Sequence, residues 1–468
     1  MLHRVLLSVL LAAPMTLGAA PAPDVPNDAA AVAHALSRLT YGARPGEVER
    51  VQRVGLARWI DDQLHPSRVP DPGMAARLAA LPTLTLDAQT ISRDYVLPAI
   101  AARRARERDT SQQPPAPPQP EARGLADGTE RRRRQPITDL TQAKILRAVY
   151  SERQLEEILV DFWFNHFNVS AAKGRTEVFI TEYERDVIRP RVFGSFRDLL
   201  GAVAKSPAML FYLDNAMSRA GGLNENYARE LLELHTLGVD GGYTQQDVVE
   251  IARAFTGWTI DPVGGRREAG FRFASAWHDR GAKTVLGHPI DAGGGLDDGE
   301  RVLDIVASHP STARHIATKL ATRFVSDAPP AALVERAAER FRATRGDLRE
   351  TVRVVITSPE FFAADARQAL LKTPLEFVVS AIRASDATLV TAMPFMRILR
   401  DLGMPPFLCQ PPTGYDDTED AWVSTGALVA RLNFANDLAH GRIPGVRVAT
   451  ADPAALAARL GAPEFQRQ

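Results

Sequence analysis

The chain has 468 residues, of which 45% are hydrophobic and 24% charged, which is ordinary for a globular protein with one large core or several smaller ones. The 56 basic residues balance the 56 acidic ones, so we do not expect the protein to be a general nucleic-acid binder. The single cysteine, Cys409, excludes an intramolecular disulfide, and we interpret it as an inert, small apolar side chain.

The first 20 residues have the pattern of a secretory signal peptide. Arg4 precedes an apolar run from Val5 to Ala13, and small residues follow as far as Ala20. The run is too short to cross a bilayer, and no later stretch approaches the roughly 18 apolar residues that a transmembrane helix needs. We therefore predict an exported protein, periplasmic or extracellular, without a membrane span.

Helical periodicity is predicted to dominate the rest of the chain. In the N-terminal part, residues 27–108, two amphipathic helices are expected to join at residues 42–45. Residues 109–136 are rich in proline and arginine and nearly free of large apolar side chains, which predicts a disordered insertion. Its basic run, residues 131–134, is expected to be a solvated loop, with weak attraction to an anionic envelope polymer or lipid as the alternative.

The segment "LEEILVDFWFNHFNVS", residues 155–170, predicts a central buried helix within a helical core over residues 137–262. Its helical wheel is apolar nearly all round. Because a buried polar group without a partner costs several kcal/mol, its narrow polar stripe must meet other polar groups. For His166, on the apolar side, core packing and a role in a site both stay open. The stripe consists of Glu157, Asp161, Asn165 and Asn168.

A second helix, expected over residues 225–237, is amphipathic. Asn224 suits its N-cap and Gly238 its C′ position. His235 lies in the middle of the apolar side and is interpreted as a core histidine with one hydrogen bond. The polar arc carries Glu225, Asn226, Arg229, Glu230 and Glu233.

Two interpretations of this arc stay open. Arg229 lies four residues from both Glu225 and Glu233, an arrangement that stabilises a solvated helix. The carboxylates are equally suited to a hard cation or a polar substrate. We hypothesise that the arc faces the polar stripe of residues 155–170 and that the two form one buried polar network.

The next stretch predicts a capped helix and then a β-hairpin insertion over residues 263–295. Thr244 is expected to cap a helix together with Asp247. Phe271 and Phe273 alternate with polar residues, the chain turns at "HDRG", and a strand resumes at "KTVLG". Residues 296–445 are again helical, with a last helix around residues 422–440, and residues 446–468 are expected to be a tail.

The predicted hairpin tip carries a candidate general base. His278 and Asp279 are adjacent there and Lys283 follows, and loops on a rigid scaffold often hold functional sites. The hairpin context argues against a metal-dependent HD phosphohydrolase, whose His–Asp pair lies on a helix. The sequence also lacks the GxSxG, HExxH, P-loop, CxxC and dinucleotide-binding motifs, which disfavours the enzyme classes that use them.

Several segments taken together resemble the bacterial family called domain of unknown function 1800, over roughly residues 30–440. They include "FWFNHF", "NENYARELLELHTLGVDGGYTQQDV", "HDRGAKTVLG" and "PPTGYDDTEDAW". The resemblance implies an exported, mostly helical protein, often encoded beside an exported sulfatase-like protein, and it implies no activity or cofactor. Family members often carry Phe at the position of His235. The residues that match recurring letters of the family motifs are Asn165, His166, Asn226, Arg229, Glu230, Glu233, His278, Asp279 and Lys283.

The sequence therefore predicts a mainly α, multi-helix globular fold with one small β-hairpin, and it supports two functional hypotheses. The leading one is a binding or assembly factor that works with another exported protein, such as the sulfatase-like neighbour. The alternative is a hydrolase-like enzyme acting on an envelope or extracellular polymer, with a polar site closed by the His278 loop. In that alternative the catalytic residues are Glu230, His278, Asp279 and His166, substrate is bound by Arg229, Asn165, Asn226 and Lys283, and a divalent cation is held by Glu230 and Glu233.

Overall fold

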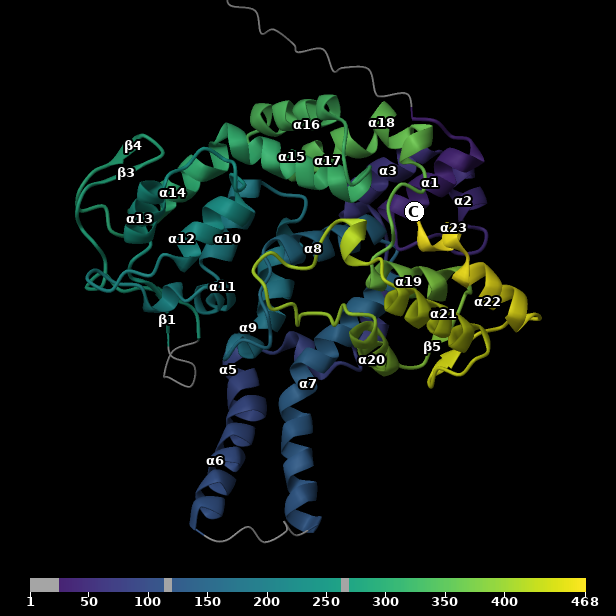
Figure 1. Cartoon of the computed structure of the whole chain (residues 1–468), viewed down its shortest axis with the longest axis horizontal. Helices are drawn as coiled ribbons and strands as arrows, with labels where there is room; N and C mark the ends of the chain where they lie inside the picture. Colours follow the sequence, from purple (N-terminus) through teal and green to yellow (C-terminus); the bar gives the residue numbers. More distant parts are fainter. Residues whose placement is uncertain (1–24, 113–119, 262–268) are drawn as a thin grey trace, which may run out of the picture.

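The computed structural model describes residues 25–112, 120–261 and 269–468, and the predicted signal peptide lies outside them. Helices dominate this part of the chain, which confirms the predicted mainly α fold (Figure 1). Among the described residues, no helix combines the length and the apolar character needed to cross a membrane.

The N-terminal region has three helices where two were predicted, because Gly55 adopts a left-handed φ of 94° that separates the second from the third. Two short helices then follow. The five are α1 (Ala29–Leu39), α2 (Glu47–Val54), α3 (Leu56–Leu64), α4 (Pro72–Leu78) and α5 (Ala88–Ile91).

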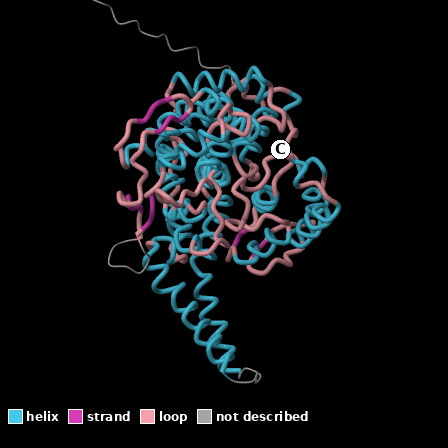
Figure 2. The backbone as a smooth tube through the Cα atoms, turned by 60° about the vertical axis from the view of Figure 1, so that its left-hand side comes forward, coloured by secondary structure: helices cyan, strands magenta, loops and turns pink. Residues whose placement is uncertain are grey.

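Two long helices, α6 (Leu97–Gln112) and α7 (Pro120–Tyr150), project together from the body of the molecule (Figures 1 and 2). The predicted disordered insertion over residues 109–136 is therefore wrong wherever the structure describes it. The prediction relied on the lack of large apolar side chains, but arginine, glutamate and alanine form helices well without burial. Ion pairs one turn apart also support the helix, for example between Arg134 and Glu130 (3.3 Å).

The predicted buried helix is α8 (Gln154–His166), which lies at the centre of the molecule (Figure 1). Its apolar side chains belong to one contiguous core that reaches both the N-terminal and the C-terminal helices. The helices that follow it are α9 (Thr176–Glu182), α10 (Phe196–Ala204), α11 (Pro207–Tyr212), α12 (Asn226–Glu230) and α13 (Gln245–Ala254).

The C-terminal helices continue to the end of the chain, so the predicted tail over residues 446–468 is wrong. The segment instead packs its own helices against the body, and the Gln468 side chain donates a hydrogen bond to Glu376 (3.0 Å). The helices are α14 (Leu296–Ser308), α15 (Pro310–Phe324), α16 (Ala331–Ala343), α17 (Leu348–Ile356), α18 (Pro359–Phe362), α19 (Pro374–Ala384), α20 (Met393–Asp401), α21 (Thr425–Ala439), α22 (Pro453–Gly461) and α23 (Pro463–Gln466).

Three small antiparallel sheets occur in the described residues, whereas one hairpin was predicted. The predicted partners, the Phe271 strand and the Lys283 strand, do not pair with each other. Leu286 and Gly287 both have a left-handed φ, so they form a tight turn that closes "KTVLGHPI" into a hairpin of its own. The pairs are β1 (Trp258–Ile260) with β2 (Phe271–Phe273), β3 (Lys283–Val285) with β4 (His288–Ile290), and β5 (Thr388–Leu389) with β6 (Val446–Arg447).

Candidate functional site

The polar stripe of α8 finds its partners in three separate parts of the chain. At its start, Glu157 accepts two hydrogen bonds from Arg189 (2.8 and 3.0 Å), and one turn later Asp161 pairs with Lys144 of α7. These carboxylates are buried or half-buried and each is compensated by a cation, as the cost of burying a charge requires. The first half of the stripe is therefore structural.

The second half of the stripe holds the loop over residues 404–417, which we call the strap. Asn165 donates a hydrogen bond to the carbonyl oxygen of Tyr415 and accepts one from its backbone N–H, both at 2.8 Å. Asn168 donates to the carbonyl oxygens of Cys409 (3.1 Å) and Pro411 (2.7 Å). The two asparagines thus satisfy backbone groups that a loop would otherwise leave unpaired against the core.

Further contacts fix the strap. The Tyr212 hydroxyl donates to the carbonyl oxygen of Gln410 (2.5 Å), and the Ala171 N–H donates to that of Phe407 (2.9 Å). Gly414 has a φ of 76°, and a Cβ there would lie only 2.5 Å from the Asn165 side-chain oxygen. Only glycine fits this close approach.

The hypothesis that the stripe of α8 faces the polar arc of residues 225–237 is therefore wrong. No hydrogen bond or ion pair joins the two in the described residues. The arc is the most polar surface nearby in the sequence, but the partner of the stripe is a loop some 250 residues later in the chain. A helical wheel compares side chains only, so it could not indicate that the stripe binds backbone groups of a distant loop.

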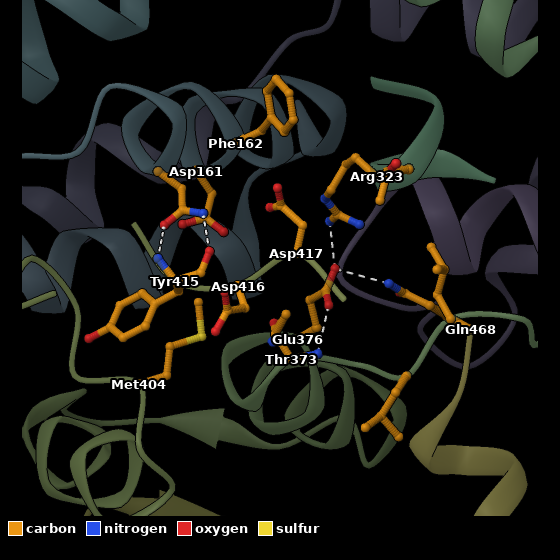
Figure 3. Close-up of a pocket in the computed structure, with 14 residues that line it drawn as sticks. Asp161, Phe162, Arg323, Thr373, Glu376, Met404, Tyr415, Asp416, Asp417 and Gln468 are labelled. Carbon is orange, nitrogen blue, oxygen red and sulfur yellow. Dashed lines mark hydrogen bonds and ion pairs between the residues drawn. The ribbon is translucent and has the colours of Figure 1, made fainter. Parts of the chain in front are cut away.

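A small cavity of about 50 Å³ opens between α8, α15, α19 and the strap (Figure 3). Glu376 is buried at its edge, where Arg323 lies 2.5 Å from its carboxylate. Burial raises the pKa of Glu376, but Arg323 and the hydrogen bonds from Thr373 and Gln468 outweigh that effect and hold the pKa below its usual value. The Glu376 carboxylate is therefore a fixed, compensated charge.

The strap contributes two further carboxylates to this cavity. Asp417 pairs with Lys319 (2.5 Å), while the exposed Asp416 makes no side-chain hydrogen bond or ion pair within the described part of the chain. Together with Asp161 they give the opening an acidic rim. Asn165, which lines this cavity, was a predicted site residue, whereas no site was predicted at Asp416 and Asp417. The signal for these two was an adjacent acidic pair in a long loop, a common position for functional residues.

The polar arc of the second predicted helix lies at the surface. Arg229 donates to Gln245 (2.9 Å) and lies 3.4 Å from Glu225 and 3.6 Å from Glu233, and all three charged side chains are partly exposed. These contacts match the solvated-face interpretation. Asn226 donates a long hydrogen bond to the carbonyl oxygen of Leu213 (3.3 Å) and so ties the start of the helix to α11.

The helix itself departs from the prediction. The α-helical part ends at Glu230, and residues Leu231–His235 form a π-helical turn, where a continuous α-helix over residues 225–237 was expected. Gly238 does end the element with a left-handed φ of 85°. Wide π turns occur frequently at functional sites.

Glu230 lies at the junction between the two helical forms. It is half-buried, and within the described residues it makes no hydrogen bond or ion pair. Burial, and after it the neighbouring Glu233, raise its pKa, and Arg229 offsets only part of that rise. Of the candidate catalytic side chains, Glu230 is the carboxylate that is free to exchange a proton.

Three histidines meet beneath this element. The His166 ring lies 6.2 Å from that of His235 and 6.1 Å from that of His315. His166 donates to the His235 carbonyl oxygen (3.1 Å), and His315 donates to that of Leu234 (3.2 Å). His166 is packed edge-on against Trp163 and Phe167 and is thus a core residue.

His235 is fully buried, as the apolar side of the helix predicted, but the predicted hydrogen bond is missing. Neither ring nitrogen has a partner. Burial above all, and His315 next, lower its pKa to about 3, so the ring is neutral in the folded protein.

His278 is also placed differently from the prediction, which put it at an exposed hairpin tip. Its side chain is 1% exposed, and its ring contacts the Thr256 carbonyl oxygen (2.8 Å) and the Asp298 carboxylate (3.1 Å). Lys283 is equally buried and donates to the same Asp298 oxygen (2.6 Å), while Asp279 pairs with Arg253. The segment is buried because it links two separate hairpins and packs on the start of α14.

The structure thus brings His278, Asp279 and Lys283 into one buried polar cluster, but it does not bring this cluster together with Asn165, Arg229 or Glu230. Sequence reasoning missed Asp298, which joins the cluster from the first turn of α14. Within the described residues no group of three or more histidine, cysteine, aspartate or glutamate side chains is arranged to hold a metal ion.

Comparisons with known proteins agree with the resemblance noted in the sequence. No curated protein and no solved structure matches the chain. Residues 34–468 match one family model, whose description is "Protein of unknown function (DUF1800)". Because the match covers nearly the whole chain, the protein belongs to the DUF1800 family.

Proposed function

We propose that the protein is a noncatalytic binding factor that holds another exported protein through an apolar surface on α21. The observation that carries the proposal is the exposure of four apolar side chains just before this helix and along its first half. Apolar side chains that gather on one exposed face are typical of interaction sites. The four residues, which we call the α21 face, are Val423 (63% exposed), Leu428 (49%), Val429 (50%) and Leu432 (42%).

The α21 face also lacks exposed charge. Between residues 423 and 433 the only charged side chain is Arg431, which is buried and donates to the Lys372 carbonyl oxygen (2.7 Å). A lack of charge at the centre of a surface distinguishes interface cores from ordinary protein surface. Uncharged apolar residues on this helix therefore fit a desolvated contact.

The acidic end of the strap leads directly into the α21 face. Trp422 donates to the Asp416 carbonyl oxygen (3.2 Å), and its ring packs near that of Tyr415. Asp416 and Asp420 are exposed beside this link. A partner segment that combines apolar side chains with a lysine or arginine is complementary to such a surface.

The partner that we propose is the exported sulfatase-like protein that is often encoded beside members of this family. Export of both proteins would bring them to the same compartment. The predicted signal peptide supports the export of this chain, and residues 1–20 carry it.

The test measures the affinity of the purified full-length protein for that neighbour. Replacing Leu428 and Leu432 by serine is expected to weaken binding by roughly tenfold or more, because truncating a buried interface side chain costs about 1–2 kcal/mol. Replacing Asp416 and Asp420 by asparagine is expected mainly to slow association and to flatten its dependence on salt.

A matched control is available on another part of the surface. Met217 and Val239 are each 70% exposed, and their replacement by serine removes similar apolar area away from α21. The control is expected to bind as the wild type does. The proposal fails if the wild type does not bind the neighbour, or if the Leu428 and Leu432 variant binds with unchanged affinity.

The hydrolase alternative stays a prediction, and one observation favours it. Glu230 is half-buried, unpaired and has a raised pKa, which suits a general acid or base. Glu230→Gln removes that proton without changing shape, so an enzyme of this kind would lose activity on an envelope polymer while keeping its melting temperature. Metal analysis, together with melting before and after chelation, tests the predicted cation at Glu230 and Glu233.

A further inference from the structure

A second cleft, remote in sequence from both the strap and α21, lies where α10, α14 and α16 meet. Its volume is about 470 Å³, which is in the usual range for small-molecule sites. Phe341, buried and packed against Phe196, forms part of its apolar floor together with Ala307. The cleft can therefore receive an apolar group.

More arginines than carboxylates line the rim of the cleft. Three arginines line it, Arg197, Arg342 and Arg345, against a single carboxylate, Asp304. That carboxylate is already paired, because it accepts a hydrogen bond from Arg197 (2.7 Å). Arg197 is also paired with Glu300 (2.8 Å), so the positive charge that a ligand meets in the cleft comes from Arg342 and Arg345.

Arg345 is the least compensated of the three. Within the described residues its exposed guanidinium makes no hydrogen bond or ion pair, whereas Arg342 has Glu335 at 3.3 Å. The planar guanidinium donates pairs of parallel hydrogen bonds to carboxylate, sulfate or phosphate oxygens. Arg345 is therefore the natural contact for an anionic group.

The backbone at this position is unusual for an arginine. Arg345 lies two residues beyond Ala343, the last residue of α16, in a left-handed conformation with φ of 55°, and Gly346 follows with φ of 81°. Glycine is favoured at such a helix end because a Cβ is strained there. An arginine held in a position that glycine would occupy at lower cost suggests that its side chain has a use.

We infer that this cleft binds an amphiphilic anion, that is, an apolar chain or ring carrying one carboxylate, sulfate or phosphate group. The apolar part lies against Phe341 and Ala307, and the anionic group lies between Arg342 and Arg345. The inference is independent of the proposed partner surface on α21, since the two share no residue.

Calorimetric titration of the full-length protein with octyl sulfate, below its micelle concentration, tests the inference. We expect one molecule to bind per chain, at least tenfold more tightly than octanol or inorganic sulfate, which each supply half of the ligand. Arg345→Gly is expected to weaken binding at least tenfold while the protein melts no lower than the wild type. Ala307→Trp, which fills the cleft and leaves the arginines in place, is expected to abolish binding.

Arg336→Gln is the matched control, because Arg336 lies on α16, shortly before Arg345 in the chain, but pairs with Glu360 outside the cleft. It is expected to bind octyl sulfate as the wild type does. Unchanged binding in both Arg345→Gly and Ala307→Trp would overturn the inference, and so would equally tight binding of octanol.

Cosedimentation with phosphatidylglycerol vesicles tells whether the natural ligand is an anionic lipid or a free organic anion. Loss of cosedimentation in Arg345→Gly would identify the natural ligand as an anionic lipid. Binding of octyl sulfate without any cosedimentation would identify it as a free organic anion.

Discussion

At the scale of single residues, His235 shows how a polar side chain is tolerated where an apolar one fits better. Its ring is fully buried and neither nitrogen is hydrogen-bonded. Folding therefore removes the hydrogen bonds between the imidazole and water without replacing them, which costs free energy. Phenylalanine fills the same kind of space without polar atoms. The neighbouring Phe167 ring, 5.1 Å away, is a suitable contact for it.

We predict that His235→Phe stabilises the protein, and more so in acid. The pKa of His235 is about 3 in the folded state and close to 6.5 in the unfolded chain, so below pH 6.5 the unfolded state binds a proton that the folded state excludes. The wild type therefore loses about 2 kcal/mol of unfolding free energy from this residue between pH 7 and pH 5. Urea unfolding of both proteins at pH 7.5 and pH 5 measures the difference.

The exposed His440 provides the control for this comparison. His440→Gln is expected to leave the unfolding free energy nearly unchanged at both pH values. If His235→Phe gave the same gain at pH 5 as at pH 7.5, the neutral buried state of His235 would be contradicted.

At the scale of elements, the strap depends on side chains from α8 for its conformation. Asn165 and Asn168 each make two hydrogen bonds to its backbone, and Phe407 within it has a left-handed φ of 64°. A large side chain in that conformation is energetically costly, so the surrounding contacts must stabilise the strap in this conformation. The asparagines, which looked like site residues in the sequence, act as its anchors.

We predict that Asn165→Ala and Asn168→Ala release the strap while α8 stays folded. Each hydrogen bond to buried backbone contributes about 1 kcal/mol, so the double variant is expected to lose roughly 4 kcal/mol of local stability. Hydrogen exchange of the amides of residues 407–417 should accelerate strongly, and exchange within α8 should change little.

Asn433→Ala, at an exposed position of α21, is the control for this experiment. Exchange in the strap should be the same in this variant as in the wild type. Equal acceleration throughout α8 and the strap in the double asparagine variant would mean that the asparagines stabilise the core as a whole, contrary to the prediction.

At the scale of the whole molecule, several buried or half-buried histidines favour the neutral form in the folded state. His34 has its pKa lowered to about 4, chiefly by burial and then by Arg38, and His235 has its pKa lowered to about 3. Burial likewise lowers the pKa of His166 and His315. A depressed histidine pKa destabilises the folded state progressively as the pH falls below about 6.5.

We predict that the protein is markedly less stable in mild acid. His34 and His235 alone are expected to remove about 4 kcal/mol between pH 7 and pH 5, a large part of the 5–15 kcal/mol typical of a folded protein. Glu376, whose pKa is lowered in the folded state, adds to the loss at still lower pH. Unfolding free energies measured at intervals from pH 8 to pH 4 should fall from about pH 6.5, and a flat profile down to pH 5 would contradict the prediction.

The elements that the sequence predicted best are those with a strong local signal. The burial of α8 and the cap formed by Thr244 and Asp247 are confirmed. Each depends on side chains within a few turns of one another, so a helical wheel or a cap pattern contains the needed information. The candidate site depended on which distant segments meet, and its main hypothesis is wrong.

The sequence by itself determined the mainly helical fold, the central position of the α8 segment and the membership of the family, because these follow from local periodicity and from long motifs kept in order. Only the tertiary structure decided that the asparagines of α8 hold the strap, that His278 is buried against Asp298, and that arginines of α10 and α16 meet at one cleft. The physical reason is that a polar side chain is satisfied by any suitable donor or acceptor within hydrogen-bond reach. Which one lies there is set by the packing of helices far apart in the chain.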